Sequence, residues 1–79
     1  MKDILDARAK SHGQWTDVAR IAQAIRTALR SSTGWAHMSP EQREALDMIA
    51  SKQARIVCGD PSFTDHWVDI AGYATLNAK

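Results

Sequence analysis

The stretch that decides the fold is SPEQREALDMIASKQARIVCGDP, residues 39–61. It opens with the signals of a helix start, because the side chain of Ser39 can cap a helix and Pro40 fits the first helical position. Gln42 lies three residues after Ser39 and completes a capping box. These residues predict a helix that begins directly after Ser39.

The same stretch also carries a stop signal. Gly59 is typical of the residue that follows a helix, and the pair Asp60-Pro61 prevents the helix from continuing. Between the two signals, apolar residues recur on one side at helical spacing. They are Ala45, Leu46, Ile49, Ala50, Ile56 and Val57.

Three further segments are predicted to be helical. The first covers residues 2–10, and the second begins after Thr16 as its cap and ends in residues 31–34. The last helix is capped by Ser62 or Thr64 and runs to about Asn77. No segment alternates with the period of a strand. The sequence therefore predicts an all-α fold, a compact bundle of about four helices in a single domain over residues 1–79.

The length of 79 residues limits the core. A chain this short buries only about 60% of its unfolded surface. Three tryptophans are many for this length, and they can serve either a core or an interface between chains. We therefore expect a homo-oligomer, with an interface that includes Trp35, Trp67 and Met48, an apolar residue among charged ones.

Composition argues against several classes of protein. The net charge of +1 gives no indication of a nucleic-acid or membrane surface. No run approaches the ~20 apolar residues of a membrane span, and the first residues do not resemble a signal peptide. The single Cys58 cannot form an internal disulfide. We expect a cytoplasmic protein.

Residues that could carry chemistry lie in the last helix. Asp65 and Asp69 are one turn apart, and Gly72 shares their face. Two such carboxylates can hold Mg²⁺, whose remaining ligands are water and phosphate oxygens. Alternatively, they form ion pairs with Lys52 and Arg55 or remain solvated, and the sequence leaves these readings open.

A second polar stripe follows the third helix. It combines acidic residues in the first turns with basic residues in the last turns, as the helix dipole favours. If this stripe meets the Asp65/Asp69 face, acids and bases share one site. The stripe consists of Glu41, Glu44, Met48, Lys52 and Arg55.

The segment of residues 65–73 reads Asp-x-x-x-Asp-Ile-x-Gly-Tyr. Together with Lys52-Gln-Ala-Arg55, Gly59-Asp60-Pro61 and upstream matches, it resembles a group of small, uncharacterised phage and prophage proteins. The resemblance covers most of the chain and implies no particular activity.

The chain is also distantly similar to MazG-like nucleoside triphosphate pyrophosphohydrolases. That resemblance implies Mg²⁺ held by acids from two helices and hydrolysis between the α- and β-phosphates. By position, Glu41 and Glu44 match the first acidic pair of that family, and Asp65 and Asp69 match the second. The second motif departs from the family, which usually has Glu-x-x-Asp.

Two functions follow as expectations. In the first, the protein binds, with or without hydrolysis, a nucleotide: Asp65, Asp69 and Glu44 hold Mg²⁺, while Lys52 and Arg55 contact phosphate. In the second, a non-enzymatic phage protein binds and inhibits or modulates a host protein, such as a defence or transcription component. The acid and base stripes favour the first, and the small size with three tryptophans favours the second.

Overall fold

The computed structural model describes residue 4 and residues 9–78. Its elements are α2 (Trp15–Arg30), the short 3-10 helix η1 (Trp35–His37), α3 (Pro40–Cys58) and α4 (Thr64–Asn77). Residues 9–12 are helical too. The described residues contain no strand, which confirms the all-α prediction. Most of the helix expected over residues 2–10 lies outside the described residues.

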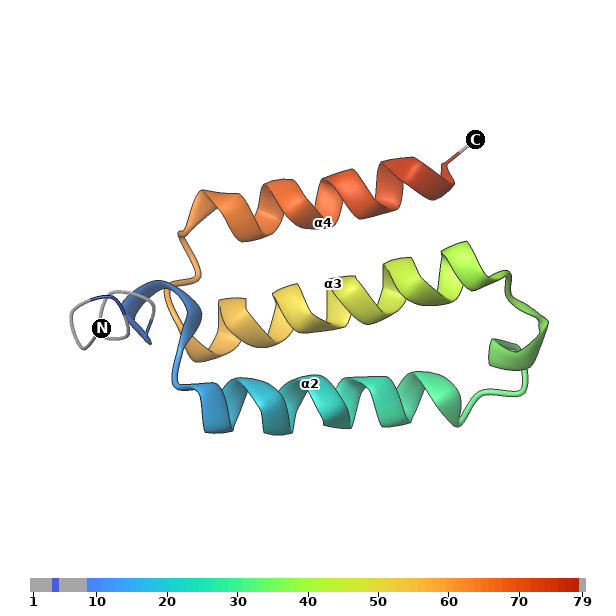
Figure 1. Cartoon of the computed structure of the whole chain (residues 1–79), viewed down its shortest axis with the longest axis horizontal. Coiled ribbons are helices and arrows are strands. Elements are labelled where there is room, and N and C mark those ends of the chain that lie inside the picture. Colours follow the sequence, from blue (N-terminus) through green and yellow to red (C-terminus); the bar gives the residue numbers. More distant parts are fainter. Residues whose placement is uncertain (1–3, 5–8, 79) are drawn as a thin grey trace.

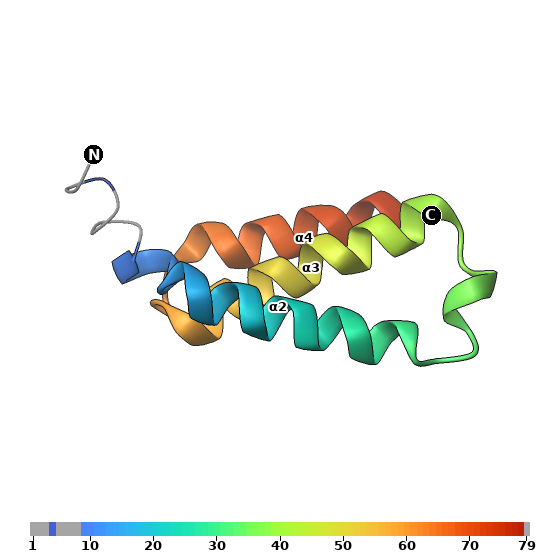
Figure 2. The same cartoon turned by 60° about the horizontal axis from the view of Figure 1, so that its bottom comes forward.

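The three long helices lie side by side, with α3 in the middle (Figure 1). Both α2 and α4 pack extensively against α3, and they do so on opposite sides of it. A turned view shows the same order, with α3 between its two neighbours (Figure 2). Within the described residues, three of the predicted helices thus form one layer, and most of the fourth lies outside those residues.

The start of α3 agrees with its prediction. The Ser39 Oγ accepts a hydrogen bond from the Gln42 backbone N–H at 3.1 Å, and the Gln42 Oε1 accepts one from the Ser39 N–H at 2.9 Å. Pro40 is the first residue of the helix. The capping box is therefore confirmed.

The two other helix starts differ from their predictions. The N-cap of α2 is Gln14 rather than Thr16, and the N-cap of α4 is Phe63 rather than Ser62 or Thr64. Neither of the observed caps makes a side-chain hydrogen bond. Tertiary contacts of neighbouring residues accompany both starts instead: Phe63 packs on His12 at the start of α4, and Gly13, directly before the cap of α2, lies close against Cys58.

The contact between residues 11–13 and the α3–α4 connection requires two glycines. Gly13 has φ +86°, in the left-handed region that favours glycine. Gly59 has φ −118° and needs no such freedom, but a Cβ there would lie 2.5 Å from the Ser11 carbonyl oxygen. The Asp60 N–H donates to that same oxygen at 3.2 Å. Gly59 thus ends α3 as predicted, and close approach of two backbones explains the glycine.

The core consists of small side chains. Alanines dominate its α3 portion, and small residues allow helix axes to approach closely. No large apolar side chain among the described residues is fully buried. The buried apolar residues are Val18, Ala22, Ala45, Ala50, Ala54 and Ile56.

Ionic contacts join α2 to α3. Arg30 donates two hydrogen bonds to the Asp47 carboxylate, at 2.9 Å and 2.7 Å. Arg26 donates to the Ser51 Oγ at 2.5 Å and to the Asp47 carbonyl at 3.0 Å. The two arginines lower the pKa of Asp47, chiefly through the hydrogen bonds from Arg30.

Candidate functional site

The two polar stripes expected from the sequence meet between α3 and α4. The Lys52 Nζ lies 2.9 Å from the Asp69 Oδ2. The side chain of Lys52 is only 13% exposed, whereas that of Asp69 is 44% exposed and reaches solvent. Of the alternatives for Asp69, the structure shows the ion pair with Lys52.

This ion pair lowers the pKa of Asp69. The hydrogen bond from Lys52 is the main cause, and the electrostatic effects of Lys52, His66 and Arg55 act in the same direction. Partial burial opposes them. Asp69 is therefore held as a carboxylate, and Lys52 is already engaged by it.

Arg55 lies one turn beyond Lys52 and is not engaged in the same way. Its partly buried guanidinium makes no hydrogen bond and no ion pair with any residue in the described part of the chain. It lines a cavity of about 420 Å³ at the junction of α3 with the start of α2. The cavity lining includes the cationic side chain of Arg55, the aromatic rings of two residues and the amide of a glutamine. Its other polar and aromatic lining residues are His12, Gln14 and Trp15.

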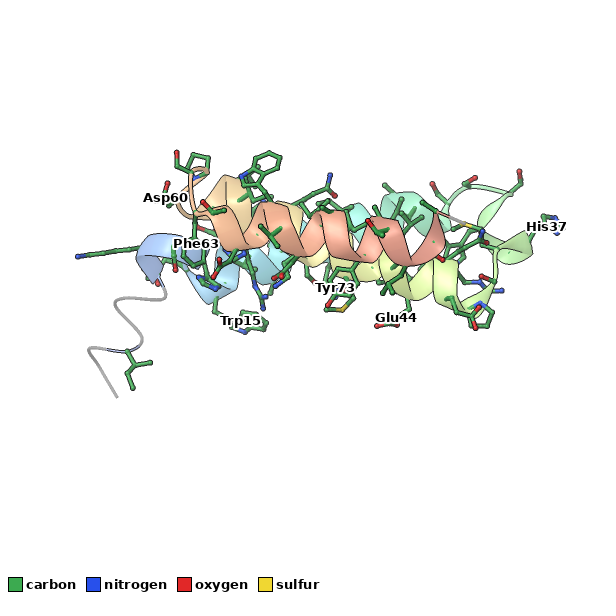
Figure 3. All side chains as sticks on the ribbon, turned by 90° about the horizontal axis from the view of Figure 1, so that it is seen from above. Trp15, His37, Glu44, Asp60, Phe63 and Tyr73 are labelled. Atoms are coloured by element: carbon green, nitrogen blue, oxygen red, sulfur yellow. The ribbon has the colours of Figure 1, made fainter. Side chains whose placement is uncertain are left out.

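Trp15 is one of the residues that line this cavity. Its side chain is 72% exposed, an unusual environment for a large aromatic ring. A smaller hollow between α2 and α3 is also lined by Trp15 and Arg55, together with Arg26 and Ser51. Seen from above α4, Trp15 and Glu44 project from the same side of the layer (Figure 3). We call this side, which carries Trp15, Glu44, Lys52, Arg55 and Asp69, the charged face.

The three acids expected to hold a metal do not come together within one chain. Glu44 lines a hollow at the other end of the layer, beside Leu76. Leu76 is seven residues beyond Asp69, or about 10 Å along the helix axis. Asp65 is exposed one turn before Asp69. The described residues contain no group of three acidic, histidine or cysteine side chains placed to hold a metal ion.

The side of α4 that faces α3 is marked by a buried histidine. Trp67, which shares one side of the helix with Ile70, Ala71 and Ala74, is 54% exposed, whereas its neighbour His66 is buried. The observed α3-facing positions are His66, Ile70 and Tyr73, at spacing i, i+4, i+7. The helix is therefore rotated toward its polar side, which lets Asp69 reach Lys52.

His66 is the residue that sequence reasoning missed. Its side chain is 1% exposed, and its Nε2 donates to the Ser11 carbonyl at 3.3 Å. The ring packs edge-on against His12 and Phe63, at 4.4 Å and 4.9 Å between ring centres. Its Nδ1 has no partner among the described residues. The available signal was a histidine at the first position of an i, i+4, i+7 stripe with Ile70 and Tyr73, and it indicates packing rather than catalysis.

The residues expected at an interface between chains lie in three different places. Met48 is partly buried on α3, at a position of the charged stripe. Trp35 stacks under the Arg30 guanidinium at 4.7 Å, in the α2–α3 connection. Trp67 donates to the Pro61 carbonyl at 2.8 Å while its ring stays half-exposed.

The fold and the site together define a small, all-helical domain with one charged face. The chain belongs to the family described as a domain of unknown function, DUF6378, whose model matches residues 1–79. No curated protein and no solved structure was found to match it. No helix in the described part of the chain is long and apolar enough to cross a membrane.

Proposed function

We propose that this protein is a cytoplasmic nucleotide-binding protein whose ligand lies on the charged face. The observation that carries the proposal is Arg55. Arg55 is partly buried, and its guanidinium makes no hydrogen bond and no ion pair with the described residues. Its donors are therefore available to a ligand that supplies oxygens.

The chemistry around Arg55 favours a phosphate next to an aromatic ring. A guanidinium presents a planar fork of donors that matches two phosphate oxygens. The exposed ring of Trp15 borders the same cavity, and an aromatic base can stack on an exposed indole. In this proposal Arg55 contacts phosphate and Trp15 contacts the base.

Asp69, Asp65 and Lys52 extend the proposal to Mg²⁺. The exposed edge of Asp69 can exchange the Lys52 ammonium for a metal ion, with Asp65 one turn away as a second carboxylate. Lys52 would then be released toward phosphate. Glu44 lies too far along the layer to join them within one chain, so we propose binding of the nucleotide without hydrolysis.

Calorimetric titration with nucleoside mono-, di- and triphosphates, with and without Mg²⁺, tests this proposal. We expect Arg55→Gln to weaken binding at least about tenfold, the effect of losing roughly 1.4 kcal/mol. The matched control is Arg20→Gln, because Arg20 is an exposed α2 arginine that lies 3.7 Å from the exposed Asp17. Wild-type protein that gives no heat with any nucleotide, or equal binding by both variants, would sink the proposal.

A second candidate is a non-enzymatic phage protein that modulates a host protein. The observation that favours it is the number of large apolar side chains left exposed by the single layer, including Trp15, Val68 and Leu76. An exposed indole is a frequent energetic centre of a protein interface. Under this alternative, Trp15→Ala abolishes binding of the host protein, and Arg55→Gln produces no nucleotide-dependent difference in melting temperature.

A further inference from the structure

The side of the layer opposite the charged face carries no charged side chain along the middle of its three helices. On α3, residues 46, 50, 53 and 57 follow one another at helical spacing, on the side away from Lys52 and Arg55. On α2 the corresponding stripe is Ile21, Ile25 and Ala28, and on α4 it is Trp67, Ile70, Ala71 and Ala74. Each stripe lies next to the residues that pack on α3, on the side away from the charged face. We call this side the apolar face. Its exposed or partly exposed residues are Ile21, Ile25, Ala28, Leu46, Gln53, Val57, Trp67, Ile70, Ala71 and Ala74, and Ala50 is already buried beneath them.

Two observations establish that these stripes share one side. Ala74 of α4 lines a groove of about 280 Å³ together with Leu46 and Ile49 of α3. On α2, the opposite stripe, which includes Trp15 and Arg26, lines a hollow with Ser51 and Arg55 on the charged face. Val18 and Ala22 are buried between these two stripes of α2. Ile21, Ile25 and Ala28 therefore lie on the same side of the layer as Leu46.

We infer that the apolar face is the interface with a second copy of this chain. Domains are stable when two layers of secondary structure enclose a core, and the described chain supplies only one layer. The buried residues of that layer are mostly alanines, which add little hydrophobic stabilisation. A second layer would enclose Leu46, Ile25 and their neighbours.

The size of the apolar face fits this interface. The helices have 16, 19 and 14 residues. With a rise of 1.5 Å per residue and helix spacings of 8–10 Å, the face measures roughly 25 by 27 Å, or about 700 Å² before side-chain relief. A stable interface buries about 800 Å² on each partner.

The charge distribution selects a second copy as the partner. In a two-fold dimer each patch meets itself, so any charge near the axis faces a like charge. The middle of the apolar face holds no Asp, Glu, Lys or Arg, and Asp17 and Arg43 lie only at the ends of its stripes, whereas the charged face holds both signs along its length. Pairing through the apolar face also leaves Arg55 and Trp15 open to solvent.

Light scattering at high micromolar concentration tests the inference. Wild-type protein should show a mass twice the 8.7 kDa of one chain. Val57→Glu should weaken self-association at least about tenfold, because two carboxylates are buried per dimer. Val57 is 70% exposed in the single chain, so its substitution leaves the fold of that chain intact.

The matched control is Leu76→Glu. Leu76 is 67% exposed and lies beside Glu44 on the other side of the layer, so this variant should keep the wild-type mass. Wild-type protein that scatters as a single chain would overturn the inference and leave the face to a different protein. A Leu76→Glu variant that dissociates while Val57→Glu remains paired would overturn it equally.

Discussion

At the scale of single residues, Gly59 at the end of α3 and Gly72 within α4 differ in the space around them. A Cβ at Gly59 would collide with the Ser11 carbonyl, whereas a Cβ at Gly72 would have no atom within 4 Å. Gly72 therefore has no structural requirement for glycine in this chain. Alanine would therefore fit at position 72 without a clash.

We predict that Gly59→Ala destabilises the protein by about 1–3 kcal/mol, the usual cost of overpacking a close contact. Gly72→Ala is the matched control and should stabilise it by about 0.5–1 kcal/mol, because alanine is the better helix former. Urea unfolding followed by circular dichroism measures both. Equal effects of the two substitutions would contradict the close approach of the α3 end to residues 11–13.

At the scale of the elements, α3 carries most of the fold, since it contacts both other helices. Its start is fixed locally by the reciprocal hydrogen bonds of Ser39 and Gln42. The starts of α2 and α4 lack such caps. These two helices depend on packing against α3, so damage to α3 should affect the whole domain.

We predict that Ser39→Ala lowers the free energy of unfolding by about 1 kcal/mol, the typical value of an N-cap. Ser62→Ala is the control, because the Ser62 side chain makes no hydrogen bond in the described structure and lies outside any helix. Chemical denaturation of both variants gives the comparison. A Ser62→Ala effect as large as that of Ser39→Ala would refute the assignment of the cap.

At the scale of the whole molecule, one carboxylate secures each outer helix to α3. Asp47 binds the arginines of α2, and Asp69 binds Lys52 across the α3–α4 contact. The pKa of each carboxyl is lowered by its cationic partners. A lowered pKa in the folded state stabilises the protein above the unfolded-state value of about 4, and this stabilisation is lost as the pH falls through the folded-state value.

We therefore predict that the melting temperature falls as the pH is lowered below about 4. The double variant Asp47→Asn, Asp69→Asn should melt lower than wild type at neutral pH and lose part of this acid dependence. Asp17→Asn is the control, since Asp17 and Arg20 are exposed and 3.7 Å apart. Differential scanning fluorimetry from pH 2 to pH 7 measures the melting temperatures. A double variant whose melting temperature falls with acid as steeply as that of wild type would contradict the prediction.

The sequence by itself determined the all-α fold and the bounds of α3. Those bounds were readable because capping, proline placement and the terminal glycine act over three or four neighbouring residues. The end of α4 near Asn77 was predicted correctly for a similar local reason, the persistence of helical spacing. The starts of α2 and α4 were predicted wrongly, because neither has a side-chain cap, and the contacts of Gly13 with Cys58 and of Phe63 with His12 join residues far apart in the sequence.

Only the tertiary structure decided how the helices share their faces. Asp69 pairs with Lys52, Glu44 lies at the far end of the layer, and Arg55 faces a cavity with Trp15. Each of these relations joins residues from different helices, and their distances depend on the order, rotation and offset of the helices. Periodicity within one helix shows which residues share a stripe, but it carries no information about which stripe of a neighbouring helix lies opposite.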